Sequence, residues 1–157
     1  IQMVLDQKDI MGDVVLQNNC VEVEMEKTAA LDFVPIEKKE LPGPILEYYN
    51  SVNGAQYDKS IEFVDSKYNT RYSVIIRTVF SFEDAKCKYV QLIEEEPQLA
   101  DYWPVASMPN EKDFMLVKIK KRNKGKVYLW NGVFGSNVLA FDSLEDFFKE
   151  LETNRTV

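Results

Sequence analysis

The same helix-start signal occurs twice in this sequence, once near its middle and once near its end. Ser81–Asp84 and Ser143–Asp146 both read Ser-x-Glu-Asp, a capping box in which the serine hydroxyl accepts a hydrogen bond from a first-turn amide. Apolar residues at helical spacing follow each signal: Ala85, Tyr89, Leu92 and Ile93 after the first, and Leu144, Phe147, Phe148 and Leu151 after the second. The sequence therefore predicts an amphipathic helix after each signal, and the second has the stronger apolar stripe.

The segment between these helices is rich in strand signals. Phe114–Ile119 is mostly apolar, Arg122–Gly125 supplies turn residues, and the side chains of Lys126–Trp130 alternate between two faces. Further strands are predicted at Ile61–Val64, Tyr72–Phe80 and Val138–Phe141. Because the strands lie together and helices flank them, we expect a single α+β domain over residues 1–157 with an antiparallel sheet flanked by helices.

Another helix is predicted ahead of these strands. Leu41-Pro42-Gly43-Pro44 suits a helix start, because the N–H groups of a first turn have no intrahelical partner and proline lacks one. Asn53-Gly54 is expected to end the helix, since glycine readily takes the left-handed conformation. Four residues share one face and are expected to be buried: Ile45, Tyr48, Tyr49 and Val52.

One periodic segment stands out before residue 40. Val21, Val23 and Met25 alternate there with three carboxylates, Glu22, Glu24 and Glu26. This period of two predicts a strand with one buried and one wet face, with a turn at Asn18-Asn19 before it. Helix is the competing prediction, because Glu and Met are good helix formers.

The charged and reactive residues exclude several classes of function. In 157 residues, 19 Lys and Arg oppose 26 Asp and Glu, and the resulting net charge of −7 disfavours direct nucleic-acid binding. The sequence has no histidine, so Ser-His-Asp and Cys-His catalysis and HExxH zinc sites are excluded. It also has no glycine-rich phosphate loop. We therefore expect no catalytic residue, cofactor or metal, with a carboxylate-based glycosidase as the less favoured alternative.

Cysteine content and apolar runs bear on location. Cys20 and Cys87 fit no CxxC pattern and are too few for a disulfide scaffold, so a reducing compartment is expected. The first residues do not resemble a signal peptide, and the apolar runs are far too short to cross a membrane. A soluble cytoplasmic protein without a membrane partner is therefore predicted.

Three groups of residues could take part in binding. Six cations lie in Lys118–Lys126 and could meet nucleic acid, but lysines on the wet face of a hairpin also prevent edge-to-edge aggregation, which we favour. Glu94, Glu95 and Glu96 are either a solvated helix end or a contact for a basic partner. The aromatic residues Tyr102, Trp103 and Trp130 could line a pocket, although large aromatics at a sheet rim more often close a core.

The ordered marks along the chain resemble one family. These marks are Leu41-Pro42, Tyr48-Tyr49, Asn53-Gly54, Trp103-Pro104-Val105-Ala106, Phe114–Ile119, Gly125–Trp130 and Ser143–Phe148. In this order they resemble the SMI1/KNR4 (SUKH) superfamily over about residues 40–152, which leaves residues 1–39 as an N-terminal extension of the same domain. The resemblance implies an α+β fold without catalytic activity. Bacterial members are largely immunity proteins that neutralise polymorphic or contact-dependent toxins, often nucleases, and fungal members regulate cell-wall synthesis.

The function expected from this resemblance is protein binding. An immunity protein that neutralises a cognate, basic toxin is the preferred expectation, and a regulatory scaffold is the alternative. The net charge of −7 would steer a basic partner toward this chain. The candidate partner-binding residues are Glu22, Glu24, Glu26, Glu94, Glu95, Glu96, Tyr102 and Trp103.

Overall fold

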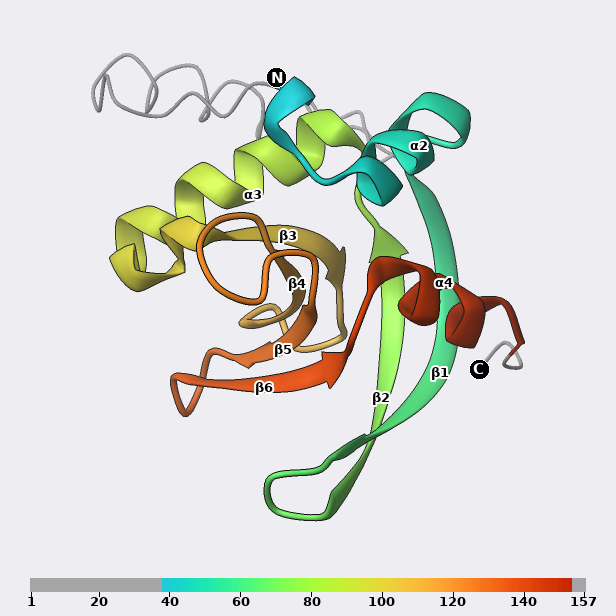
Figure 1. Cartoon of the computed structure of the whole chain (residues 1–157), viewed down its shortest axis with the longest axis vertical. Coiled ribbons are helices and arrows are strands. Elements are labelled where there is room, and N and C mark those ends of the chain that lie inside the picture. The colour runs from blue at the N-terminus through green and yellow to red at the C-terminus, as the bar shows by residue number, and fades with distance from the viewer. Residues whose placement is uncertain (1–37, 154–157) are drawn as a thin grey trace, which may run out of the picture.

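The computed structural model describes residues 38–153 (Figure 1). The elements in chain order are η2 (Lys38–Glu40), α2 (Gly43–Ser51), β1 (Ala55–Asp65), β2 (Thr70–Val79), α3 (Phe82–Glu95), η3 (Pro97–Asp101), β3 (Tyr102–Ser107), β4 (Asp113–Lys118), β5 (Val127–Asn131), β6 (Ser136–Phe141) and α4 (Leu144–Thr153). The predicted strand that carries Glu22, Glu24 and Glu26 lies outside the described residues, as does the turn before it. The choice between strand and helix there stays a prediction.

The six strands form one antiparallel sheet in which each strand pairs with the next in the sequence. Together with the three α-helices of the described residues, this sheet confirms the predicted α+β fold class with an antiparallel sheet flanked by helices. Five strands coincide with the predicted ones, and β1 and β6 extend beyond the predicted strands at their N-terminal ends. The strand that the sequence did not reveal is β3, because Pro104 interrupts its pattern and four consecutive residues of it are buried.

Both predicted capping serines occupy the expected positions. The Asp84 backbone N–H donates to Ser81 Oγ over 3.1 Å at the start of α3, and the Asp146 N–H donates to Ser143 Oγ over 3.1 Å at the start of α4. These bonds satisfy amides that have no partner within the helix. The apolar stripes also face inward, with Leu144, Phe147 and Leu151 buried on α4 and Ala85, Tyr89 and Ile93 buried on α3.

Helix α2 follows the prediction except at its end. Pro42 is its N-cap, and Ile45, Tyr48 and Tyr49 are buried. The prediction that Val52 shares this buried face is wrong, because the helix ends at Ser51 and the Val52 side chain is 52% exposed.

The turn after α2 is fixed against the start of α3. Asn53 Oδ1 accepts a hydrogen bond of 2.9 Å from the Phe82 backbone N–H. Gly54 has φ +106°, and a side chain there would place its Cβ 3.1 Å from the Cβ of Ser81. The turn therefore requires glycine for both its conformation and its close approach. In this chain the Asn53-Gly54 mark serves the fold.

Helix α4 fills the gap between the two outer strands of a strongly curved sheet (Figure 1). Strand β2 pairs with β3 only through Thr78 and Val79, so the long β1–β2 hairpin diverges from the other strands. The ring centroids of Phe63 on β1 and Phe141 on β6 lie 5.7 Å apart, and Phe147 of α4 lies 5.7 Å from Phe141. These three rings join β1, β6 and α4.

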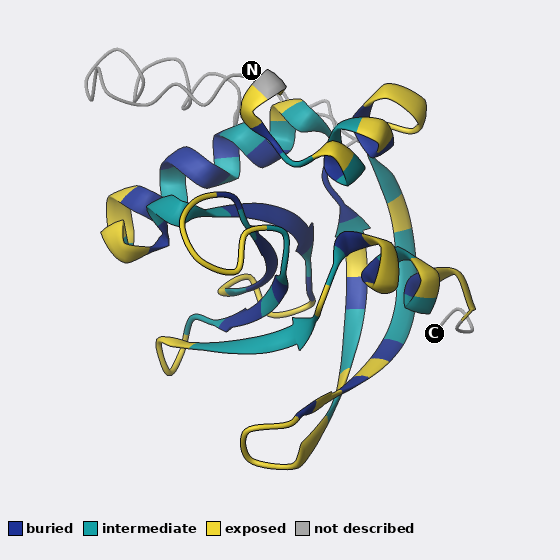
Figure 2. Cartoon of the chain, in the orientation of Figure 1, coloured by how far each residue is buried: buried dark blue, intermediate teal, exposed yellow. Residues whose placement is uncertain are grey.

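A continuous series of aromatic rings runs through the core. Neighbouring rings lie 5.1–6.0 Å apart between centroids, in the order Tyr89, Trp103, Phe82, Tyr49, Tyr48, Phe148, Phe147, Phe141, Phe63 and Tyr72. The series connects all three helices with β1, β2, β3 and β6. Buried residues lie on the strands and helices, whereas the turns are exposed (Figure 2). Aromatic pairs at these distances add about 0.5–1.5 kcal/mol each beyond simple burial.

Candidate functional site

The predicted acidic trio lies at the end of α3. Glu94 and Glu95 are exposed and Glu96 is half-buried, with its Oε1 accepting a bond of 2.9 Å from Gln98 Nε2. Carboxylates at this end of a helix are disfavoured by the helix dipole, so the trio does not serve the stability of α3. Its proposed contact with a basic partner stays a prediction.

Tyr102 and Trp103, the two predicted aromatic contact residues, are neighbours on β3 but differ in burial. Trp103 is completely buried, with its Nε1–H donating to the Tyr49 hydroxyl over 2.8 Å. The prediction that Trp103 contacts a partner is therefore wrong, because successive side chains of a strand point to opposite faces and this one points into the core. Tyr102 is half-buried, and its ring makes an edge contact with Tyr128 at 5.4 Å. Of these two aromatic residues, only Tyr102 stays a candidate for contact with a partner.

The basic segment Lys118–Lys126 forms the turn between β4 and β5. Lys120, Lys121, Arg122 and Lys124 are exposed, as expected for the wet end of a hairpin. Lys121 Nζ pairs with Asp101 at 3.0 Å, Lys126 Nζ pairs with Asp142 at 3.6 Å, and the Lys118 ammonium lies over the Tyr102 ring. Exposed ion pairs of this kind contribute about 0–1 kcal/mol each. Tyr102 thus belongs to the basic turn, where its ring contacts Tyr128 and Lys118.

A second acidic surface lies on α4, where the sequence had predicted only a core helix. We call it the α4 acidic face, and its residues are Asp142, Glu145, Asp146, Glu150 and Glu152. Lys149 is the one cation between Asp142 and Glu152, so this stretch has a net charge of −4. Residues 38–153 together carry sixteen Lys and Arg against eighteen Asp and Glu, a net charge of only −2. The α4 acidic face therefore concentrates negative charge in a domain that is otherwise nearly balanced.

A shallow depression of about 390 Å³ lies beside this face. Its walls are Ala140, Phe141, Asp142, Asp146, Lys149, Glu150 and Thr153, from the end of β6 and the exterior of α4. Apolar groups are thus placed beside three carboxylates. This combination suits a long basic side chain, whose methylene stem contacts apolar surface while its charged head meets carboxylates.

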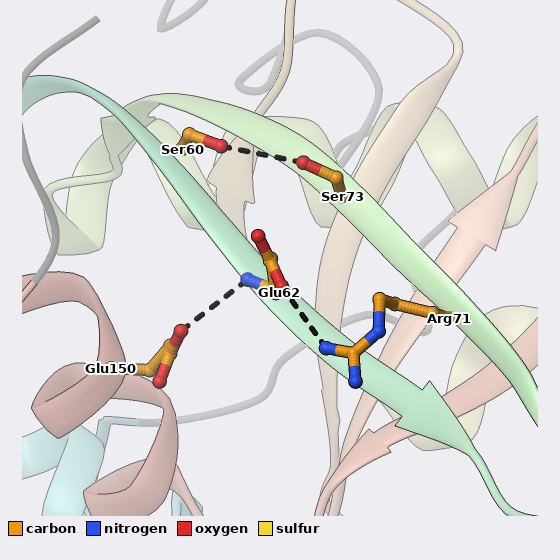
Figure 3. Close-up of polar contacts among 5 residues, drawn as sticks. All are labelled: Ser60, Glu62, Arg71, Ser73 and Glu150. Atoms are coloured by element: carbon orange, nitrogen blue, oxygen red, sulfur yellow. Dashed lines mark hydrogen bonds and ion pairs between the residues drawn. The ribbon is translucent and has the colours of Figure 1, made fainter.

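Glu150 connects the α4 acidic face to the β1–β2 hairpin (Figure 3). The Glu62 backbone N–H on β1 donates to Glu150 Oε2 over 3.4 Å, and the Glu62 carboxylate pairs with Arg71 at 3.1 Å. The hydroxyls of Ser60 and Ser73 lie 3.5 Å apart farther along the same strand pair. Glu150 therefore holds the helix to an outer strand, which leaves Glu145, Asp146 and Glu152 as the exposed carboxylates of this helix.

The described residues contain no arrangement suited to metal chemistry. Among residues 38–153, no three His, Cys, Asp or Glu side chains lie close enough together to hold a metal ion. None of the helices in this range is both long and apolar enough to cross a membrane. The exposed carboxylates of α4 are suited to binding cationic groups of another molecule.

Cysteine chemistry departs from the expectation. Cys87 is buried on α3 and is disulfide-bonded, and Cys20, the other cysteine of the sequence, lies outside the described residues. A disulfide counts against the reducing compartment that the low cysteine number had suggested.

Comparisons of the chain with protein-family models, with curated proteins and with solved structures found no match.

Proposed function

We propose that this chain is a non-enzymatic binding protein of SUKH immunity type that neutralises a basic protein toxin. The observation that carries the proposal is the α4 acidic face, which presents exposed carboxylates beside a shallow depression lined by both apolar and polar groups. A toxin that acts on nucleic acid needs a basic surface, and an acidic surface of this kind attracts it. The family marks quoted from the sequence support the same role.

The depression would receive a lysine or arginine of the toxin. Phe141 and Ala140 would contact the aliphatic part of that side chain, and Asp146 would meet its charged head, because Asp142 already pairs with Lys126. Charge-assisted hydrogen bonds are roughly twice as strong as neutral ones, so such a contact would add specificity as well as attraction.

The proposal is tested by removing charge from α4. In the triple variant Glu145→Gln, Asp146→Asn, Glu152→Gln, we expect association with the toxin domain encoded beside this chain's gene to slow about tenfold at about 50 mM salt. At about 300 mM salt the difference should fall within about twofold, because the Debye length shortens. Stopped-flow measurement of the association rate gives both values.

The matched control is the variant Glu94→Gln, Glu95→Gln, Glu96→Gln, which also removes three charges. It changes the opposite end of the molecule (Figure 1), and we expect a smaller effect on the rate. An unchanged rate and salt dependence in both variants, or no toxin domain encoded beside the gene, would contradict the proposal. Thermal unfolding checks that folding is retained, since Glu145 and Asp146 also favour the first turn of α4 by about 0.3–1 kcal/mol each.

The proposed place of action is the cytoplasm, where an immunity protein meets a toxin that has entered the cell. The disulfide-bonded state of Cys87 weighs against this location. Alkylating free thiols while native cells are lysed, and then counting the alkyl groups on each denatured chain by mass spectrometry, decides between the cytoplasm and an oxidising compartment. Two alkylated cysteines per chain are expected for the cytoplasm, and none for an oxidising compartment.

A further inference from the structure

The turn between β5 and β6 exposes two large apolar side chains. Phe134 is 82% exposed and Val133 is 60% exposed, and Phe134 has the highest exposure of any large apolar residue in the described chain. Figure 2 shows this turn as an exposed tip that projects from the sheet before β6. Turns are usually built from polar residues and glycine, so two adjacent apolar residues at the tip are unexpected.

Other residues supply the geometry of this turn. Asn131 Oδ1 accepts hydrogen bonds from the Val133 and Phe134 amides over 3.1 and 3.2 Å, and its carbonyl accepts one from the Gly135 N–H over 2.8 Å. Gly135 has φ +67°, in the left-handed region. The turn is therefore specified by Asn131 and Gly135. The side chains of Val133 and Phe134 do not belong to the core cluster of the described residues.

A second set of contacts holds the turn against the loop between β3 and β4. The Gly132 N–H donates to Asp113 Oδ1 over 3.1 Å, and a Cβ on Gly132 would collide with the Lys112 carbonyl oxygen. No side chain fits between the two loops, so the tip is held on both sides. A rigid apolar tip loses little conformational entropy on binding, which makes it an effective anchor.

We propose that Val133 and Phe134 form the apolar anchor that inserts into a pocket on the protein partner. This rests on the proposed function, because the same partner would meet the α4 acidic face. Strand β6 joins the tip to α4 and has six residues, which span about 20 Å. A standard interface of about 800 Å² per partner is about 30 Å across, so one partner can cover both.

A pocket on a protein fits this anchor better than a bilayer does. One Phe and one Val supply about as much apolar surface as a single short acyl chain or less, and one such chain gives only marginal membrane binding. An anionic lipid surface would also repel a chain with a net charge of −7. A rigid aromatic side chain at the centre of a protein interface is instead a typical hot spot.

The test compares Phe134→Ala with Tyr68→Ala in binding to the same toxin domain. Tyr68 is 70% exposed on the β1–β2 turn, so it is an exposed aromatic residue on a different tip. We expect Phe134→Ala to weaken binding at least about thirtyfold through faster dissociation, and Tyr68→Ala to change it less than about threefold. The Phe134→Ala effect should persist at about 300 mM salt, where charge effects fade.

The outcomes separate this inference from the proposed function. Wild-type binding that Phe134→Ala leaves unchanged overturns only the anchor, whereas no wild-type binding overturns the function and the anchor with it. Two further measurements test other occupants. Sedimentation with vesicles of phosphatidylcholine and phosphatidylglycerol that depends on Phe134 would assign the tip to a bilayer, and a dimer that Phe134→Ala dissociates would assign it to a second copy. Either result overturns the proposal.

Discussion

Phe147→Ala is expected to destabilise the protein by about 3–5 kcal/mol, the range typical of a buried phenylalanine that leaves a cavity. Phe147 is completely buried and lies 5.7 Å from Phe141 and 5.4 Å from Phe148 between ring centroids. Its ring stands where α4 closes the gap between β1 and β6. The cavity would therefore open at the junction of three elements, which are poorly able to collapse into it. Urea titration gives the free energy of unfolding.

Phe134→Ala provides a matched control for this measurement. It makes the same chemical change at a side chain that is 82% exposed, so the free energy of unfolding should change by less than about 0.5 kcal/mol. A loss below about 1 kcal/mol for Phe147→Ala would mean that α4 does not pack as described. A large loss for Phe134→Ala would mean that the β5–β6 tip has a structural role, which would remove the basis for the anchor.

The elements that could be predicted are those with local signals. Capping serines and apolar stripes locate α3 and α4, and alternation or β-branched content locates five of the six strands. The packing of α4 between the outer strands β1 and β6 could not be predicted in this way. It depends on Phe63, Phe141 and Phe147, which are distant in sequence, and no periodic pattern relates them.

Candidate binding residues were harder to predict than the fold. Trp103 is a candidate contact residue in the sequence because it is a large aromatic, but β3 is buried along four consecutive residues and has no alternation that shows its inner face. The acidic residues of α4 were visible in the capping box, yet the apolar stripe alone determined the role given to that helix. Asn131-Gly132 is a turn signal in the sequence, and Val133 and Phe134 follow it. The apolar pair that follows it was the missed indication, because turn chemistry does not require it.

Burial of tyrosines makes the protein sensitive to alkaline pH. Burial raises the pKa of Tyr49 well above its usual range, against the opposing effect of the Trp103 N–H bond. Burial, and to a smaller extent the nearby Asp101, raises the pKa of Tyr89 to about 12. Burial, and to a smaller extent the nearby Tyr57, also raises the pKa of Tyr48 above its usual value. In the unfolded chain these phenols ionise near pH 10.

The sign of the effect follows from proton binding. Above about pH 10 the unfolded chain has released these protons while the folded chain still holds them, so the free energy of unfolding falls as pH rises. Below about pH 10 these tyrosines do not change the free energy of unfolding. Above it, the free energy of unfolding falls until the pH reaches the pKa values of the tyrosines in the folded protein. Tyr49, the most deeply buried of the three, contributes up to about 1.4 kcal/mol per pH unit between about pH 10 and its folded pKa, and Tyr48 and Tyr89 contribute less. The free energy of unfolding should therefore be lower at about pH 12 than at about pH 8 by about a few kcal/mol.

Tyr49→Phe separates this contribution from the titration of other groups. At about pH 8 the variant should lose about 1 kcal/mol, because the Trp103 N–H loses its acceptor inside the core. Between about pH 10 and 12 its stability should fall less steeply than that of the wild type, by about 1.4 kcal/mol per unit, since one phenol no longer ionises on unfolding. Urea titrations across this range, followed by tryptophan fluorescence, give both slopes. Equal slopes would show that the Tyr49 hydroxyl reaches solvent in the folded protein, which would contradict the buried contact between α2 and β3 on which the aromatic core depends.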